Sequence, residues 1–347
     1  MTGATPGPVD LFSDTHTIPD AGMRRAMAEA EVGDEQLGED PTTAALERRV
    51  SEMLGTEAAV LLPTGSMCNK VGVASLTRPG DAVVVDSMAH VLRFEGGGPA
   101  VLSGVVFEPI ATTLGHFTPE QFLAVANVGS VYQSRTSLVC LEQTHNFAGG
   151  TVWPLARYRA VCDTAREFGA AVFTDGARLF NAVAASGIPA AEWAAPVDAL
   201  WVDCSKAVGA PGGAVLAGSA EVVERATRFK YLFGGAMRQS GVLAAAALYG
   251  LDHNVPRLAE DHRRAADLAA GLASAGCDVQ VPETNMVFFD PSPAGCAADR
   301  FVAEMGRRGV RTSTAAGRVR AVTHVGVDDE GIAAAVAAAE DLLRSES

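Results

Sequence analysis

Short apolar segments alternate with segments of helical pattern along this 347-residue chain, and this alternation leaves few folds open to it. Strands are expected at 58–63, 82–85, 104–108, 137–141, 171–174, 199–203 and 213–217. Helices are expected at 21–30, 43–54, 64–76 and from residue 118, where a threonine cap precedes a proline. Strands that alternate with helices predict an α/β fold with a mostly parallel sheet covered on both faces.

A second, smaller α/β unit is expected after a long Ala- and Leu-rich helix that begins near Gly235. Its elements are predicted at 279–281, 286–289, 298–308, 318–322 and 330–344. The chain is too long for one typical domain and suits two unequal ones. We therefore predict a large cofactor-binding domain of residues 1–250 with a polar N-terminal arm, and a small C-terminal domain of residues 251–347.

Lys206 follows the buried strand 199–203 at the point where the strand gives way to a loop of small residues. Burying an ammonium group is costly, and the usual result is a lowered pKa. A lysine that is neutral near pH 7 is a nucleophile, as a Schiff base with an aldehyde cofactor requires. Taken alone, a lysine whose charged end reaches the solvent from a strand end is the simpler explanation.

Asp175 ends the strand 171–174 and is followed by Gly176. Pyridoxal 5'-phosphate needs a carboxylate against its pyridine nitrogen, because the protonated ring is a better electron sink. An acid at one strand end and a lysine at another meet this need together. Asp-Gly is also a common turn, so the pair is suggestive only.

A phosphate seat is predicted where the strand 58–63 leads into a helix that opens with Thr64, Gly65, Ser66 and Met67. Glycine lets the backbone approach a ligand closely, and the free amides of a first helical turn point at an anion. An ordinary helix cap by Thr64 or Ser66 explains the same residues equally well. No P-loop lysine follows and no G-x-G-x-x-G opens a helix, so a single phosphate is expected rather than a nucleotide.

Composition and charge exclude several classes of function. A formal net charge of −14 with scattered basic residues argues against binding to nucleic acid or to an anionic membrane. The six cysteines lack the paired spacing of a metal site, so no metal is expected and they are interpreted as reduced core thiols. With no signal peptide and no 18-residue apolar span, we predict a soluble cytoplasmic protein.

In its motifs and their order the chain resembles the low-specificity L-threonine aldolases. These enzymes belong to the β-eliminating lyase group of fold type I pyridoxal phosphate enzymes. The motifs cover nearly the whole chain and lie at 10–15, 32–34, 38–42, 63–67, 144–146, 175–182, 205–206, 237–239, 284–286 and 319–324. Each motif is weak alone, but together they are specific.

The resemblance implies a role for each of four residues around the cofactor. Lys206 is expected to hold pyridoxal phosphate covalently and Asp175 to pair with its ring nitrogen. His90 matches a histidine that stacks on the cofactor ring. His145 matches a second histidine placed to handle the substrate β-hydroxyl, and a histidine suits proton abstraction because its pKa lies close to operating pH. Which residue is the base stays open.

The resemblance also implies how the amino-acid substrate is bound and cleaved. Arg178, which also lies against the cofactor, and Arg320 are expected to hold the substrate carboxylate, with Ser13 adding a hydroxyl. Lys230 and Arg238 flank a glycine segment and are assigned to the cofactor phosphate or to a subunit interface. The expected reaction is retro-aldol cleavage of a β-hydroxy-α-amino acid to glycine and an aldehyde, in a homodimer or homotetramer.

The departures from the family pattern cluster at one rim of the expected site. His16 and Ile18 replace a valine and an arginine of the family, and Leu37 replaces a tyrosine. Two explanations of these departures stay open: neutral drift, or a pocket in which His16 contacts the substrate side chain. A pocket lined by His16 would favour a β-hydroxy amino acid other than threonine, or the aldol addition or transaldol exchange in place of cleavage. β-Elimination, racemisation and transamination by the same residues, or a non-catalytic protein that has kept the fold, are the remaining alternatives.

Overall fold

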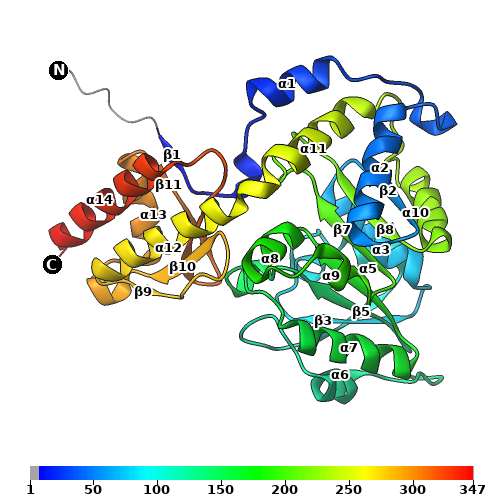
Figure 1. The fold of residues 1–347 in the computed structure, drawn as a ribbon. Coiled ribbons are helices and arrows are strands. Elements are labelled where there is room, and N and C mark those ends of the chain that lie inside the picture. The colour runs from blue at the N-terminus through cyan, green and yellow to red at the C-terminus, as the bar shows by residue number, and fades with distance from the viewer. Residues whose placement is uncertain (1–7, 347) are drawn as a thin grey trace.

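The computed structural model describes residues 8–346, which form a larger and a smaller lobe (Figure 1). The larger lobe is built on a seven-stranded sheet of order β2-β8-β7-β6-β5-β3-β4. Only β8 runs antiparallel to both of its neighbours, so the predicted mostly parallel sheet is confirmed. The strands are β2 (Ala58–Leu62), β3 (Ala82–Asp86), β4 (Val106–Ile110), β5 (Thr136–Glu142), β6 (Ala171–Gly176), β7 (Ala199–Asp203) and β8 (Ala214–Gly218).

Helices cover both faces of this sheet, which explains why its strands are apolar along their whole length. On β3, Val84 packs into one core while Val83 and Val85 pack into the other. The first core is completed by α2 (Pro41–Leu54), α7 (Leu155–Phe168), α8 (Leu179–Ser186), α9 (Ala190–Ala194) and α11 (Gly241–His253). The second is completed by α3 (Gly65–Leu76) and α10 (Ala220–Leu232).

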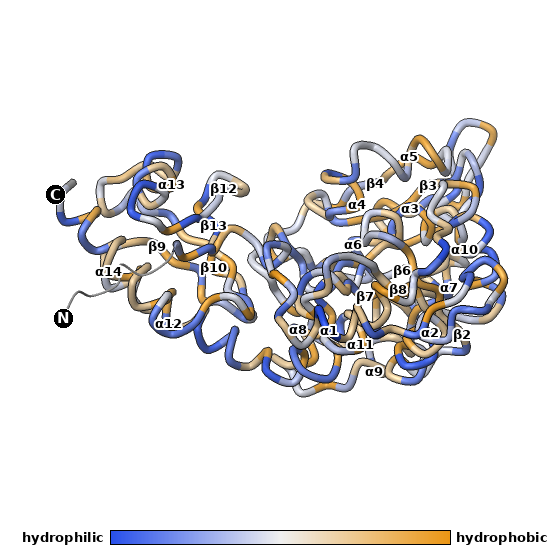
Figure 2. The backbone as a smooth tube through the Cα atoms, turned by 90° about the horizontal axis from the view of Figure 1, so that it is seen from above, coloured by the Kyte–Doolittle hydropathy of each residue, from blue (hydrophilic) through white to orange (hydrophobic). Residues whose placement is uncertain are grey.

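The smaller lobe is a four-stranded antiparallel sheet of order β12-β13-β10-β9 packed against helices. Figure 2 shows the two lobes joined by a narrow waist. The sheet strands are β9 (Asp278–Val279), β10 (Met286–Asp290), β12 (Ser313–Ala315) and β13 (Arg318–Val322). The helices are α12 (Leu258–Ser274), α13 (Ala298–Arg307) and α14 (Asp329–Glu346).

The N-terminal arm joins the smaller lobe. Its strand β1 (Val9–Asp10) pairs in parallel with β11 (Val310–Arg311), and both Val9 and Leu11 lie in the smaller lobe's core. The predicted domain boundary near residue 250 falls inside α11, and the long helix expected from Gly235 begins at Gly241. The start of the arm is thus a structural part of the C-terminal unit although it is the first part of the chain.

Shorter elements complete the described chain. They are η1 (Asp14–His16), α1 (Ala21–Ala28), η2 (Glu35–Leu37), α4 (His90–Arg93), α5 (Gly98–Ser103), α6 (Pro119–Val125), η3 (Asn146–Ala148), η4 (Val255–Arg257) and η5 (Ser292–Ala294). Among the described residues no helix has the length and apolar character needed to cross a bilayer.

The carboxyl edge of the large sheet carries a row of acids. Asp86, Glu142 and Asp203 are the last residues of β3, β5 and β7, and Asp175 is the last but one of β6. All four are buried. Ligands of open α/β sheets bind outside the carboxyl ends of the strands, so this edge is where a site is expected.

Candidate active site

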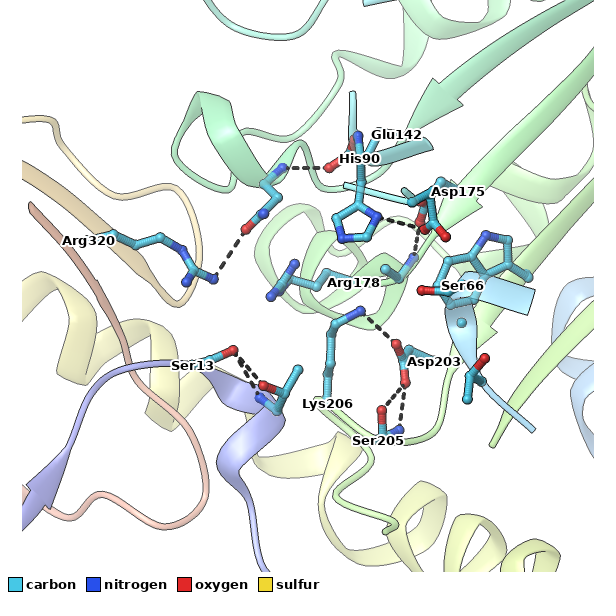
Figure 3. Close-up of a pocket in the computed structure, with 17 residues that line it drawn as sticks. Ser13, Ser66, His90, Glu142, Asp175, Arg178, Asp203, Ser205, Lys206 and Arg320 are labelled. Carbon is cyan, nitrogen blue, oxygen red and sulfur yellow. Dashed lines mark hydrogen bonds and ion pairs between the residues drawn. The ribbon is translucent and has the colours of Figure 1, made fainter. Parts of the chain in front are cut away.

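A cavity of about 350 Å³ lies at this edge and brings together residues of the large sheet, the arm and the smaller lobe (Figure 3). Eight of the predicted site residues line it, whereas Met67, His16 and His145 do not. Its lining consists of Ser13, Thr15, Thr64, Gly65, Ser66, His90, Glu95, Glu142, Asn146, Asp175, Ala177, Arg178, Trp201, Asp203, Ser205, Lys206 and Arg320. In the described part of the chain, no cluster of three or more His, Cys, Asp or Glu side chains could hold a metal ion.

Lys206 lies in a loop after β7 and points its amino group into the cavity (Figure 3). Its Nζ donates to Asp203 Oδ2 at 2.6 Å and lies 5.7 Å from the centre of the Trp201 ring. The other oxygen of Asp203 accepts from the backbone amide and the hydroxyl of Ser205, both at 2.7 Å. The candidate nucleophile is therefore paired with a buried acid three residues before it.

Asp175 is held from two sides. Its Oδ2 accepts from Asn69 Nδ2 at 2.7 Å, and its Oδ1 accepts from the backbone amide of Ala177 at 3.0 Å. Burial and the nearby charge of Glu142 raise the pKa of Asp175 to about 6. A cationic partner in the cavity would favour its ionised form, as the ring nitrogen of the predicted cofactor would.

His90 begins the short helix α4, which Glu142 fixes in place. Glu142 accepts from the backbone amide of His90 at 2.7 Å and from that of Asn146 at 2.8 Å. The ring Nδ1 of His90 lies 2.9 Å from Glu95. Burial opposes protonation of His90, but the bond to Glu95 and the charges of Asp175 and Glu142 outweigh burial and raise its pKa. Nε2 is left without a partner in the described chain.

Arg178 is already neutralised. Its Nε and Nη2 each donate to Asp14 at 2.7 Å, and both side chains are buried. Asp14 also accepts from Asn285 at 3.3 Å, so this carboxylate joins the arm, the large lobe and the smaller lobe. Burial opposes ionisation of Asp14, but Arg178 outweighs it and holds the pKa of Asp14 well below its usual range.

Arg320 reaches the cavity from β13 and has only neutral partners. Its Nη1 donates to the carbonyl of Phe12 and its Nη2 to Asn146 Oδ1, both at 3.2 Å. Its buried Nε has no partner among the residues that the structure describes. Burial and the nearby charge of Arg178 lower the pKa of Arg320 to about 10. This guanidinium therefore has no carboxylate partner in the described chain, and an anion in the cavity would stabilise its charge.

The predicted phosphate seat is the start of α3, which Thr64 caps by accepting from the amide of Met67 at 3.2 Å. The amides of Gly65 and Ser66 make no hydrogen bond within residues 8–346 and remain available to an anion. A side chain at Gly65 would collide with the Trp201 ring, since a β-carbon would lie 2.5 Å from it. The helix cap is therefore confirmed, Met67 contributes to it, and the anion seat stays a prediction.

His145 lies behind the cavity and not in its lining. Its ring is almost wholly buried; Nδ1 accepts from the amide of Ala148 at 3.2 Å, and Nε2 lies 3.1 Å from Asp86. An accepting Nδ1 requires the proton to sit on Nε2, facing Asp86. Burial disfavours its charge, but Glu142 and Asp86 outweigh burial and raise its pKa. In this geometry the ring has no free lone pair for a substrate.

The departing residues of the rim also lie outside the cavity lining. His16 bonds through Nδ1 to Asp10 at 2.9 Å and stacks on Phe12 with a centroid distance of 4.9 Å. Leu37 is 70% exposed, and Ile18 is 73% exposed. Lys230 does not line the cavity either, and it is buried in an ion pair with Glu35.

Sequence analysis did not identify several residues that shape this cavity: Asn69, Glu95, Glu142, Asn146, Trp201 and Asp203. For Glu142 and Asp203 a signal was present, because each is an acid that ends an apolar strand, as Asp175 nearly does. Asn69 links two of these residues to Asp175: it donates to Glu95 at 3.1 Å and to Asp175, and it accepts from Trp201. Nothing in its local sequence marks that role.

Comparison with known families and proteins gives a consistent result. The sequence profile named beta-eliminating lyase matches residues 10–293. The low specificity L-threonine aldolase of Escherichia coli K12 is 40% identical over 326 residues, which cover 94% of this chain and 96% of that protein. Low-specificity L-threonine aldolase 1 of Arabidopsis thaliana is 39% identical over 289 residues, 81% of each chain.

Solved structures agree on the fold. A Leishmania major threonine aldolase superposes with a TM-score of 0.83, covering 97% of this chain and all of that one, at 20% identity. A serine palmitoyltransferase of Sphingomonas wittichii superposes with a TM-score of 0.76 at 19% identity, covering 98% of this chain and 88% of that one. The predicted α/β fold of type I pyridoxal phosphate enzymes is thereby confirmed.

Proposed function

The chain belongs to the β-eliminating lyase family and groups within it with the low-specificity L-threonine aldolases, and we propose from this premise that it cleaves L-β-hydroxy-α-amino acids of the threonine type to glycine and an aldehyde. It is a pyridoxal phosphate-dependent carbon–carbon lyase. The observation that carries the proposal is the cavity in which Lys206, Asp175 and Arg320 meet.

The residues of the cavity fit pyridoxal 5'-phosphate. When bound, this cofactor supplies an electrophilic aldehyde and an electron-accepting ring. Lys206 is the amine that would hold the aldehyde carbon, and Asp175 is the buried acid for the ring nitrogen. The free amides of Gly65 and Ser66 would receive the phosphate, and His90 would lie against the ring. Asp203 also lies beside the expected phosphate site, and its negative charge would repel the phosphate of the cofactor.

Arg320 is the group best suited to the substrate carboxylate. Its buried Nε lacks a partner and its two other nitrogens bond only neutral oxygens, so a carboxylate would satisfy its charge. Arg178 keeps one terminal nitrogen beyond its pair with Asp14, and Ser13 adds a hydroxyl from the arm. These three groups would fix the carboxylate of the substrate in the cavity that His90 also lines.

The proton of the β-hydroxyl needs an acceptor within reach of the cavity. His90 lines the cavity and has a free ring nitrogen, whereas both ring nitrogens of His145 face groups of the protein. The geometry favours His90 as the acceptor. His145 would then act on Asp86 and the loop of Ala148, and its direct role requires the ring to turn away from Asp86.

β-Elimination is the second reaction to test, because the matching family profile carries that name. Both reactions use a lysine, a ring-nitrogen acid and a carboxylate arginine, so these residues do not separate them. The products do: retro-aldol cleavage releases glycine and an aldehyde, whereas elimination releases a keto acid and ammonia.

The deciding experiment measures these products from the cofactor-loaded full chain. Substrates are L-threonine, L-allo-threonine, phenylserine and β-hydroxyaspartate, with Lys206→Ala as the inactive control. We expect glycine and aldehyde in equal amounts, with threonine or allo-threonine among the substrates cleaved. Keto acid and ammonia in their place would favour elimination, and no turnover of any substrate would refute the proposal.

A homodimer or homotetramer and a cytoplasmic location complete the proposal. The oligomeric state is supported by the family alone. All six cysteines are buried and none forms a disulfide in the described chain, as is usual in a reducing compartment.

A further inference from the structure

Asp203 is a buried carboxylate at the place where the cofactor phosphate is expected. It is 4% exposed and lines the cavity. Its Oδ2 lies 3.1 Å from the point that a β-carbon on Gly65 would occupy, so it faces the first residue of α3. A negative charge here is stabilised by the helix terminus, as that of a phosphate would be.

The carboxylate also takes up the hydrogen-bond donors around this seat. Lys206 Nζ, the amide of Ser205 and the hydroxyl of Ser205 all donate to Asp203, at 2.6 to 2.7 Å (Figure 3). Lys206 has no other ion pair in the described chain. The pair of Asp203 and Lys206 has no net charge, so the lysine does not by itself attract an anion to the cavity.

We propose that Asp203 is an internal anion that competes with the phosphate of the cofactor and thereby weakens cofactor binding. This inference rests on the proposed function, because it takes the cofactor to be a phosphate ester whose phosphate sits at the start of α3. A phosphate there meets like-charge repulsion from Asp203, and the donors on Ser205 are already engaged. Removing the charge leaves Lys206 unpaired and the seat attractive to anions.

The test compares Asp203→Asn and Asp203→Ser with the unchanged protein, each as the cofactor-free full chain. Calorimetric titration with inorganic phosphate measures the seat alone, and titration with pyridoxal and with pyridoxal 5'-phosphate separates the aldehyde from the phosphate. We expect both variants to bind phosphate and pyridoxal 5'-phosphate about tenfold more tightly, and pyridoxal to change less. The circular dichroism spectrum and thermal unfolding identify a variant that fails to fold.

Asp86→Asn is the matched control, because Asp86 is another buried acid on the same sheet edge and does not line the cavity. It should leave phosphate binding unchanged. Unchanged or weaker phosphate binding in either folded Asp203 variant would overturn the inference, as would an equal gain for pyridoxal or an equal gain in Asp86→Asn. Absence of phosphate binding in all proteins would overturn it too. None of these titrations requires turnover, so a failure of the proposed reaction is seen separately.

Discussion

The two walls of the cavity differ in how their charges are satisfied. On the wall formed by the large sheet, three basic side chains each pair with a carboxylate of the chain: Lys206 with Asp203, His90 with Glu95, and Arg178 with Asp14. On the wall formed by the smaller lobe, Arg320 bonds only neutral oxygens.

The difference indicates that the two walls have different roles in binding. Charges that are paired inside the protein hold a fixed arrangement and stabilise it, because breaking a buried pair leaves an uncompensated charge. A buried cation with neutral partners gains most when an anion arrives. The sheet wall would therefore hold the cofactor and its geometry, and the smaller lobe would sense the substrate carboxylate.

The largest effect is expected from Lys206, on which the sheet wall depends. Lys206→Ala and Lys206→Arg should each lower kcat/KM by about 10⁴-fold or more, because neither side chain can hold the cofactor aldehyde covalently. Steady-state kinetics and the visible absorbance of the cofactor measure this. Lys206→Arg preserves the charge beside Asp203, so substantial activity in this variant would show that the charge suffices and that the sheet wall does not hold the cofactor covalently.

Asp14→Asn should damage stability. Arg178 would remain buried without a counterion, and the free energy of unfolding at pH 7 should fall by about 3–5 kcal/mol. Urea unfolding measures it. Because the pKa of Asp14 is depressed in the folded state, its stabilising contribution is complete above its unfolded pKa, near 4, and is lost as the pH falls below that value. The difference in the free energy of unfolding between the unchanged protein and Asp14→Asn should therefore narrow below about pH 4. A difference that stays constant with pH would contradict this expectation.

Arg320→Gln should act on substrate and hardly on stability. Loss of the guanidinium should raise KM by about 30- to 100-fold, the size expected for a charge-assisted hydrogen bond to a carboxylate. The free energy of unfolding, measured with urea, should fall by less than about 1 kcal/mol, because the partners left behind are neutral oxygens. A large loss of stability with an unchanged KM would mean that both walls are structural and that the two arginines do not differ in role.

That Lys206, Asp175 and the turn of Gly65 and Ser66 meet in one cavity could be predicted from sequence, because each stands out locally. Each is a polar or glycine residue where an apolar strand ends, and the carboxyl ends of parallel strands meet at one edge. The same reasoning would have found Glu142 and Asp203 as residues of the edge. The contacts of each acid could not be predicted in this way. Four acids share that edge, and only the packing of the folded chain decides which one faces Lys206.

Partners far apart in the sequence could not be predicted. Asp14 pairs with Arg178 across 164 positions, and β1 joins β11 across the length of the chain. The orientation of His145 depends on Asp86, a residue on another strand. Such pairings follow from the folded arrangement of the lobes and leave no periodicity in the sequence.

The smallest effects are expected at the rim, where the chain departs from its family. His16 bonds to Asp10 and stacks on Phe12 beside the cavity, in an ion pair that is about one-third exposed. His16→Val should therefore cost less than about 1 kcal/mol of stability. It should change the kcat/KM ratio of phenylserine to threonine by less than about twofold, since the ring does not line the cavity. Leu37→Tyr, at a site 70% exposed, is the companion variant, with the same expectation. A reversed preference in His16→Val alone would place the arm in contact with the substrate side chain, and substrate selection would then belong to the arm and not to either wall.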